Sequence, residues 1–349
     1  MLPVGTEAND YRERPLSTDA AQERVDSDES ELEAGAVEEG GGAPERRTLQ
    51  VGAGLHGQRV DRVLVHIAPE FSRNHLQGLL GRGHVWVDGV VARLASRRVH
   101  AGQRVAIELV ATEESRAFMP QAMALSVLYE DEHLLVLDKP PGLVVHPAPG
   151  NWSGTLLNGL LAHHPLAAAL PRAGIVHRLD KDTSGVMMVG KSLPAVTALS
   201  RAVAAREVKR RYLALAHGAP LQDQFTVEAA IGRDARVRVR MAVVSVGAGG
   251  RAARTDVHCL ARLGGISALS CTLHTGRTHQ IRVHLMSLGH PLVADALYGG
   301  KPALGMLRQA LHATELGLNH PVTGRALNFR AAAPADFAAA WTQVAGAPS

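Results

Sequence analysis

Cysteine, aromatic residues and long apolar runs are all scarce in this 349-residue sequence. The two cysteines, Cys259 and Cys271, form no C-x-x-C pair, which excludes a disulfide scaffold and a zinc site built on cysteine pairs. No stretch approaches the roughly 18 consecutive apolar residues of a membrane span, and the N-terminus lacks the apolar segment of a signal peptide. We therefore expect a cytoplasmic protein without a membrane partner.

Lysine is scarce as well, because 5 of the 37 basic residues are lysine and 32 are arginine. The charges are unevenly distributed along the chain. Residues 1–45 contain 13 acidic and 3 basic residues, a net charge of −10, whereas residues 46–349 carry a net charge of +14. A basic body favours a polyanionic partner, most simply nucleic acid, and the planar guanidinium group suits contacts with phosphate.

Apolar residues make up 46% of the sequence, which is enough to build the cores of two domains. The N-terminal segment differs from the rest, since residues 1–48 are rich in Glu, Asp, Gly and Ser and nearly lack aromatic residues. Such a segment buries too little apolar surface to offset its chain entropy. We expect residues 1–48 to form a disordered acidic leader.

The next segment, residues 49–110, has the pattern of a small domain. Apolar spacing predicts helices over residues 60–67 and 73–82. The sequence V-W-V-D-G-V-V at 85–91 predicts a tight hairpin, and an alternating run predicts a strand over 104–109.

This small domain carries a recognisable combination of motifs: G-x-R-V-D-R-V-L, F-S-R-N-x-L-Q-x-L-L and G-x-V-W-V-D-G. The combination resembles the αL RNA-binding motif of ribosomal small-subunit proteins and many RNA-modifying enzymes. The resemblance implies that basic helix faces contact RNA phosphates. The candidate contacts are Arg59, Arg62, Arg73 and Arg82. The alternative for each single arginine is a solvated helix face.

Residues 111–125 are polar and without periodicity, which predicts a linker. Residues 126–345 then form a larger unit, with buried strands predicted at 134–137 and 186–189 and an alternating strand at 212–216. Helices do not alternate regularly with these strands. We therefore expect an α+β fold with a mixed or antiparallel sheet.

The densest run of ionisable residues is H-R-L-D-K-D-T-S-G at 177–185, between two apolar stretches. Charges so close to a core require partners. Asp182 and Thr183 suit a turn with side-chain to backbone hydrogen bonds. A turn does not require Arg178 or Asp180, which makes these two residues candidates for function.

The run at 177–185 closely resembles the catalytic motif of the RluA family of RNA pseudouridine synthases. Three further segments are similar to that family: V-L-D-K-P-P-G-L-V-V-H-P with G-T-L-L-N in 134–158, K-R-R-Y-L-A-L-A-H-G at 209–218, and L-H-T-G-R-T-H-Q-I-R-V-H-L with G-H-P-L-V-A-D-A-L-Y-G-G in 273–300. Including the αL domain, the resemblance covers roughly 280 residues.

The resemblance implies a pseudouridine synthase catalytic domain that isomerises specific uridines. The segments look most like those of members that modify large-subunit (23S) ribosomal RNA, which would then be the partner. The reaction moves the ribose from a ring nitrogen to a ring carbon without gain or loss of atoms, so we expect neither a cofactor nor a metal. The target nucleotide must leave its stack, because the glycosidic bond has to be reached. We expect the enzyme to be a monomer.

The resemblance also assigns catalytic roles. Breaking the glycosidic bond requires an ionised carboxylate near the sugar, as nucleophile or base, and the matching residue is Asp180. Arg282 matches the arginine that holds this carboxylate ionised. Tyr212 matches a tyrosine that packs on the uracil, and Arg178 matches an arginine that fills the gap left by the flipped base.

A helix is predicted over 278–288, with Gly289 at its end. Three apolar side chains at helical spacing are expected to face the core: Ile281, Leu285 and Leu288. Arg282 flanks this stripe and can reach a buried partner, whereas Arg277 stays near the helix entrance. Arg277 and Lys181 are further candidate RNA contacts.

The histidines of this region do not predict a metal site. His274, His279 and His284 are five residues apart, so a single helix cannot direct them at one ion. We interpret them as structural or RNA-facing, and His177 as a hydrogen-bonding neighbour of its loop.

Two alternatives remain at this level. Residues 180–184 weakly match the D-x-D-x-T motif of magnesium-dependent phosphatases that use an aspartyl nucleophile. The second alternative is a non-catalytic RNA-binding or ribosome-assembly protein, for which the αL domain and the positive charge would suffice.

Overall fold

The computed structural model describes residues 45–110, 117–148, 150–237 and 239–346. The chain divides into two compact units, with the boundary between Leu109 and Val110. We describe each unit by itself.

The small N-terminal unit packs two helices against an antiparallel sheet, as its sequence predicted. Within its described residues the strand order is β1-β4-β2-β3: β1 (Glu45–Gln50), β2 (Val85–Val87), β3 (Val90–Val91) and β4 (Arg104–Leu109). A short 3-10 helix, η1 (Ala53–Leu55), precedes the two helices, α1 (Val60–Ile67) and α2 (Arg73–Arg82). The helices begin and end at the predicted residues. Their apolar positions form the core of the unit, including Val63, Leu64, Leu76 and Leu80.

The expected boundary of the acidic leader is wrong at its C-terminal end. Residues 45–48 belong to β1, which pairs with β4 over six residues from Glu45↔Leu109 to Gln50↔Arg104. Backbone pairing stabilises this segment despite its polar composition, and Arg47 also forms an ion pair with Glu70. The remainder of the predicted leader lies outside the described residues.

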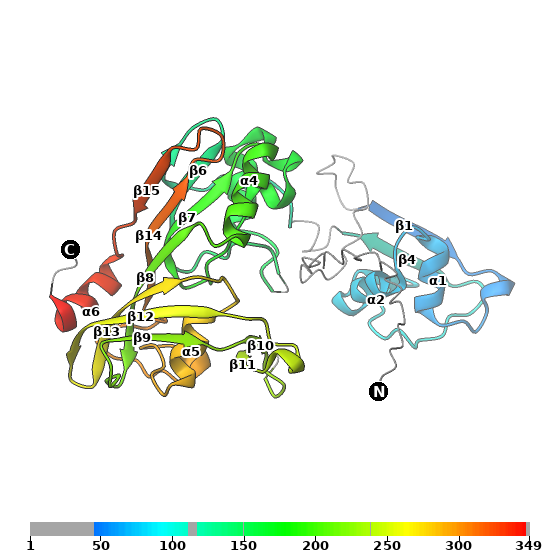
Figure 1. The fold of residues 1–349 in the computed structure, drawn as a ribbon. Helices are drawn as coiled ribbons and strands as arrows, with labels where there is room; N and C mark the ends of the chain where they lie inside the picture. Colours follow the sequence, from blue (N-terminus) through cyan, green and yellow to red (C-terminus); the bar gives the residue numbers. More distant parts are fainter. Residues whose placement is uncertain (1–44, 111–116, 149, 238, 347–349) are drawn as a thin grey trace, which may run out of the picture. The chain divides into compact units, whose positions relative to one another are not determined.

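The large unit is built around one mixed sheet (Figure 1). Among its described residues the strand order is β5-β6-β7-β14-β8-β13-β12-β9, and β15 pairs with β14. The strands are β5 (Ser126–Glu130), β6 (Leu134–Lys139), β7 (Ser184–Gly190), β8 (Lys209–His217), β9 (Gln224–Glu228), β12 (Arg254–Leu263), β13 (Ile266–Leu273), β14 (Leu311–Asn319) and β15 (Ala326–Arg330). The β7–β14 pair is parallel and the other pairs are antiparallel. This arrangement confirms the predicted α+β class.

Helices and a short ribbon accompany this sheet. The α-helices are α3 (Leu156–His163), α4 (Leu193–Ala204), α5 (Gln280–Ser287) and α6 (Ala335–Ala345). The 3-10 helices are η3 (Pro165–Ala169), η4 (Pro171–Gly174), η5 (Val246–Ala248) and η6 (Ala296–Tyr298), and the ribbon consists of β10 (Ile231–Arg233) and β11 (Met241–Val243). In Figure 1, α4 lies beside β7, and α5 lies beside the ribbon.

Strand β8 shows how the sheet separates two faces. Tyr212 and Ala214 belong to the main core, whereas Leu215 belongs to a second cluster in which α6 contributes Phe337 and Trp341. Because side chains alternate along a strand, Tyr212 lies on the face opposite to α6.

Two expectations at segment boundaries need correction. The expected linker at 111–125 is described from Ala117 onward, and this part packs on the large unit because the buried amide of Asn158 donates to the carbonyls of Ala117 and Met119. The expected helix at 278–288 is shorter, Gln280–Ser287. Leu288 is 47% exposed rather than buried, since the chain leaves the helix there and turns at Gly289, which has a φ of +83°.

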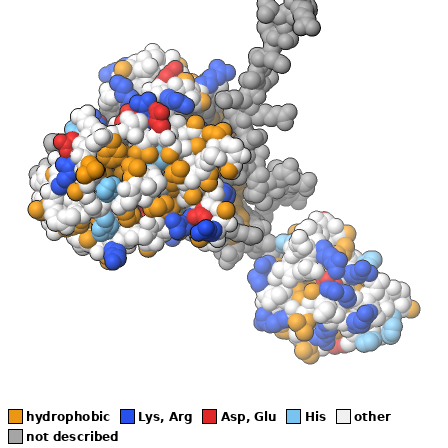
Figure 2. All heavy atoms as spheres, turned by 60° about the horizontal axis from the view of Figure 1, so that its bottom comes forward, with side chains coloured by type: hydrophobic (Ala, Val, Ile, Leu, Met, Phe, Trp, Pro, Cys, Tyr) orange, Lys and Arg blue, Asp and Glu red, His pale blue; other side chains and the backbone are white. Residues whose placement is uncertain are grey.

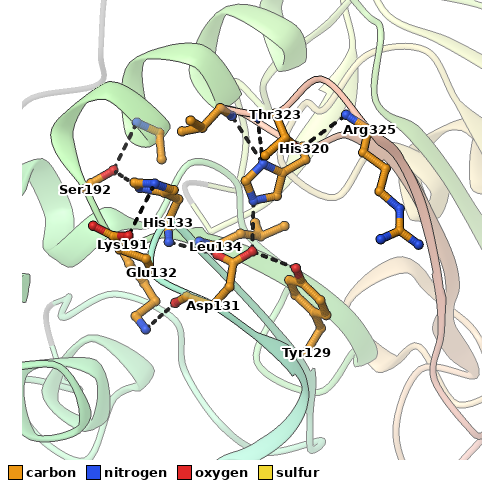
Figure 3. A network of polar contacts seen from close by, with 12 residues as sticks. Tyr129, Asp131, Glu132, His133, Leu134, Lys191, Ser192, His320, Thr323 and Arg325 are labelled. Carbon is orange, nitrogen blue, oxygen red and sulfur yellow. Dashed lines mark hydrogen bonds and ion pairs between the residues drawn. The ribbon is translucent and has the colours of Figure 1, made fainter.

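A polar network links the turn between β5 and β6 to the residues that follow β14 (Figure 3). Asp131, in the turn between β5 and β6, accepts hydrogen bonds from the Tyr129 hydroxyl and from Nε2 of His320, which follows β14. Nδ1 of His320 accepts two backbone N–H groups, so its proton resides on Nε2. Burial raises the pKa of Asp131, but the hydrogen bonds from Tyr129, from the backbone N–H groups of His133 and Leu134, and from His320 outweigh it and lower the pKa to about 2. The network therefore joins three segments through one ionised carboxylate.

Candidate active site

The run of ionisable residues at 177–185 forms a loop that folds back onto β7. Nε2 of His177 accepts a hydrogen bond of 3.0 Å from the Met188 backbone N–H. The Thr183 N–H donates to the carbonyl of Asp180, which closes the predicted turn. His177 is therefore the hydrogen-bonding neighbour of the loop that we predicted, and Asp180 lies at the bend.

Asp180 forms an ion pair with Arg282, which lies 102 residues further along the chain on α5. The distance from Nη1 of Arg282 to Oδ2 of Asp180 is 3.0 Å. The side chain of Asp180 is 17% exposed and that of Arg282 is 7% exposed. The predicted pairing is thus present, and Oδ1 of Asp180 faces away from the guanidinium contact.

A second carboxylate, Asp295, holds Arg282 in place and was missed by the sequence analysis. Its two oxygens accept hydrogen bonds of 2.8 and 2.9 Å from Nε and Nη2 of Arg282, and its side chain is 1% exposed. Although burial lowers the pKa of Arg282, the contacts with Asp295 and Asp180 outweigh burial and raise this pKa. The guanidinium is therefore a permanent cation in a fixed orientation.

Tyr298 and His279 complete the surroundings of this pair. The Tyr298 ring lies beneath Arg282, with 5.0 Å between Cζ and the ring centroid. The Tyr298 hydroxyl accepts from the Met241 N–H at 3.0 Å and lies 2.8 Å from Nδ1 of His279. The hydroxyl therefore donates its own proton to Nδ1, which leaves the ring proton of His279 on Nε2.

His279 was interpreted as structural or RNA-facing, and the structure places it beside Asp180. Its Nε2 lies 3.9 Å from Oδ1 of Asp180, the oxygen that Arg282 does not contact. His279 precedes α5 with a φ of +56°, an uncommon conformation for a residue other than glycine. Burial lowers the pKa of His279, which favours the neutral ring. The other two histidines have structural partners: His274 contacts Asp256, and His284 contacts Thr255.

Tyr212 lies in the middle of the sheet on the same side as the main core. Burial raises its pKa to about 12; the charge of Arg210 opposes this shift and that of Asp180 adds to it. The phenol is therefore protonated at neutral pH. Because Asp180 and Arg210 both act on this hydroxyl, the three side chains belong to one electrostatic environment.

Lys139 connects β6 to the loop at 177–185 and was also missed. Its side chain is fully buried, and Nζ donates to the carbonyls of Pro140, Leu143 and Lys181 at 2.8 to 3.0 Å. Burial lowers its pKa to about 8, against the charges of Asp182 and Asp180. The lysine therefore holds the backbone immediately after Asp180.

The remaining predicted residues of this unit lie at the surface of the site. Arg178 and Lys181 are exposed. Arg277 stays near the entrance of α5, where its Nε donates to the carbonyl of Ala252 at 3.2 Å. Their contacts with RNA remain predictions.

The four predicted arginines of the small unit separate into two pairs. Arg59 and Arg73 both contact Asp61, whose side chain is completely buried. Burial raises the pKa of Asp61, but Arg59, Arg73 and Gln77 lower it to about 2. Arg62 and Arg82 are exposed. Figure 2 shows Lys and Arg side chains distributed over the visible face of this unit.

Two negative findings concern the described part of the chain. No group of three or more His, Cys, Asp or Glu residues is placed there to hold a metal ion. No helix in those residues is long and apolar enough to cross a bilayer.

Comparisons with known proteins match both units. Residues 133–287 match the model of the RNA pseudouridylate synthase family, and residues 58–105 match that of the S4 domain. The "Ribosomal large subunit pseudouridine synthase D" of Neisseria meningitidis serogroup B is 45% identical over 301 residues, covering 83% of this chain and 79% of the relative. The protein of the same name from Pseudomonas aeruginosa is 43% identical over 306 residues, covering 84% and 93%. A solved structure of "Human RNA Pseudouridylate Synthase Domain Containing 4" shares the fold with a TM-score of 0.50 at 24% identity, covering 62% of this chain and 92% of that one.

Proposed function

Since the chain belongs to the RNA pseudouridylate synthase family and is an isomerase with an S4 RNA-binding domain, we propose that its substrate is large-subunit ribosomal RNA. In this RNA it converts specific uridines to pseudouridine. The relatives at 43 to 45% identity that carry a large-subunit name support this choice, as does the net charge of +14 behind the leader. The family resemblance noted in the sequence is confirmed.

The observation that supports this chemistry is the contact between Asp180 and the guanidinium of Arg282, which has a fixed orientation. Arg282 is fixed by Asp295 on one side and reaches Asp180 on the other. This arrangement gives the largely buried carboxylate a fixed counter-cation and leaves Oδ1 for the substrate. Asp180 then acts on the ribose of a flipped uridine as nucleophile or base.

The isomerisation is balanced without any further reactant. The bond between N1 and C1′ breaks, C5 bonds to C1′, the proton of C5 is lost and N1 gains one. We propose that Tyr212 packs on the uracil, that Arg178 fills the gap left by the flipped base, and that the exposed arginines of the S4 domain contact phosphates. On this proposal the enzyme acts as a cytoplasmic monomer without a cofactor.

The phosphatase alternative does not fit the observed loop. An aspartyl nucleophile of that class directly follows an apolar strand, whereas Asp180 precedes β7. Its carboxylate contacts an arginine rather than other metal-binding groups.

Tritium release tests the proposal directly. Large-subunit ribosomal RNA transcribed with [5-³H]uridine should lose tritium on incubation with the full chain, because C5 exchanges its proton for the ribose. The Asp180→Ala variant should release none. No release by the wild type would leave RNA binding as the only function, and equal release by both proteins would remove Asp180 from the mechanism. Mapping of pseudouridines would identify the modified positions.

A further inference from the structure

A buried arginine on the same face of the sheet as Tyr212 has no ion-pair partner among the residues that the structure describes. Arg210 lies in β8 and is 6% exposed, and its Nε is enclosed without a hydrogen-bond acceptor. Its guanidinium forms no ion pair with any residue that the structure describes. Arg282, by contrast, contacts two carboxylates.

An enclosed guanidinium nitrogen without an acceptor destabilises the folded protein. Nε of Arg210 has lost its hydration and gains no hydrogen bond in return. A methionine of similar length would fill the same space without this cost. Local features that reduce stability are typical of sites where a ligand or transition state supplies the missing interaction.

Three segments of the active site surround Arg210. It precedes Tyr212 by two residues, so both side chains leave β8 on the same face. A Cβ built on Gly276, in the turn before α5, would lie 2.8 Å from Nη1 of Arg210. Besides burial, the charge of Arg210 lowers the pKa of His177, in the loop that carries Asp180.

We propose that Arg210 is a further catalytic residue, whose guanidinium contacts a carbonyl oxygen of the flipped uracil and stabilises the negative charge of the detached base. This inference rests on the proposed function. When the N1–C1′ bond breaks, both bonding electrons stay on the uracil, and the charge spreads over N1 and the carbonyl oxygens. The charge is removed when C5 bonds to C1′. The proton then leaves C5, and N1 is protonated.

The absence of an internal counter-charge among the described residues favours a partner that becomes negative during the reaction. Preorganised cations of this kind accelerate a reaction because they act more strongly on the transition state than on the bound substrate. A backbone phosphate is charged throughout, so a contact with phosphate would increase RNA affinity rather than rate. The enclosure of Arg210 favours the flat base over the strongly hydrated phosphate.

The first test separates rate from affinity. We expect Arg210→Met to lower the single-turnover rate at saturating RNA by about 10²- to 10³-fold. The Kd for the RNA, measured in an Asp180→Asn background, should change by less than about twofold. Arg210→Lys, which keeps the charge, should recover part of the rate. A Met variant with nearly normal rate overturns the inference, and so does a weaker Kd with normal rate at saturation.

A better leaving group provides a second test. Fluorine at C5 stabilises the uracil anion, so RNA that contains 5-fluorouridine depends less on Arg210 for cleavage of the glycosidic bond. The ratio of the wild-type rate to the Arg210→Met rate should be about tenfold smaller with this RNA. Chromatography of the digested nucleosides measures both rates. An equal deficit with both RNAs contradicts charge stabilisation of the base.

Stability and matched variants exclude a purely structural role. Arg210→Met should unfold at the same temperature as the wild type or above it, whereas parallel losses of stability and activity would make the arginine structural. Gly276→Ala should lower the rate by displacing Nη1. Arg211→Met is the control, because Arg211 lies on the opposite face and pairs with Glu315. A wild-type enzyme that releases no tritium refutes the proposed function, whereas an active wild type with an equally active Met variant refutes Arg210 alone.

Discussion

The two domains use arginine in opposite ways. In the S4 domain, Arg62 and Arg82 are exposed on helices, and even the arginines that contact Asp61 keep nearly half of their side-chain surface. In the catalytic domain, Arg282 and Arg210 are almost completely buried. Exposed cations bind phosphates in roughly additive, salt-sensitive steps. Buried cations act on single charges at short range in a medium of low polarity.

This difference predicts which variants change affinity and which change rate. A surface ion pair contributes little to stability, with a median below about 1 kcal/mol. Removing one partner of a buried pair typically costs about 3–5 kcal/mol, because it leaves an uncompensated charge. Variants in the catalytic domain should therefore have large effects on turnover, and variants in the S4 domain small effects on binding.

The largest effect is expected at Asp180. Asp180→Asn preserves shape and removes the charge, so turnover should fall by at least about 10³-fold. RNA affinity should stay within about threefold of the wild type, since the phosphate contacts remain. Tritium release and fluorescence anisotropy measure the two quantities. A large loss of affinity would contradict the division between the domains.

The next effect concerns the cation between two carboxylates. Arg282→Met removes the guanidinium between Asp180 and Asp295, so we expect a rate about 10²-fold lower and a free energy of unfolding lower by about 3 kcal/mol. Urea unfolding and single-turnover kinetics check both. Asp295→Asn is the sharper variant, because it weakens only the positioning of Arg282. Normal activity in Arg282→Met would remove this arginine from the mechanism.

A moderate effect is expected in the S4 domain. Replacing Arg62 and Arg82 by Gln should raise the Kd about three- to tenfold and reduce the slope of log K against log salt by about 1 to 2. The rate at saturating RNA should not change. Arg73→Gln is the comparison, because it removes a partner of the buried Asp61 and should reduce stability instead. An unchanged salt slope in the double variant would show that these two residues do not contact phosphate.

The last prediction concerns the pH dependence of stability in the catalytic domain rather than turnover or binding. Burial and the charge of Arg210 lower the pKa of His177 to about 3, and Nε2 of His177 accepts the Met188 N–H. The folded state therefore binds this proton less readily than the unfolded state. Its contribution to stability is present above pH 6.5 and is lost toward pH 3, with a slope of about 1.4 kcal/mol per pH unit.

Urea unfolding between pH 7 and pH 4 measures this slope. His177→Gln should flatten the curve by the equivalent of one proton, and Arg210→Met should leave most of the slope in place because burial is the larger cause. Identical slopes for the wild type and the Gln variant would show that His177 is not the titrating group.

Much of the local structure was predictable from short-range patterns. Helices α1 and α2 have the predicted bounds, and the hairpin at 85–91 and the strand at 104–109 are present. Apolar spacing, capping residues and turn residues act between near neighbours, so they can be read from the sequence. The error at 45–48 has the same origin, because a polar strand is stabilised by a partner more than fifty residues away.

The ion pair of Asp180 and Arg282 was predictable by a different route. Four ordered motifs identified Asp180, Tyr212 and Arg282 through a resemblance, and the helical position of Arg282 agreed with a buried partner. The structure confirms the contact between Asp180 and Arg282. The roles of Arg178, Lys181 and Arg277 in binding RNA remain predictions.

Composition, periodicity and motif order thus sufficed for the fold class, the two domains and the chemical family of this enzyme, because each depends on residues close together in the chain. The partners of the buried charges emerged once the strands were paired. Asp295 fixes Arg282, Tyr298 orients His279 and Lys139 holds the loop at 177–185, while Nε of Arg210 has no acceptor among the described residues. The environment of a buried charge depends on the side chains that the folded backbone brings within a few ångströms of it. Separation along the sequence does not predict which side chains these are.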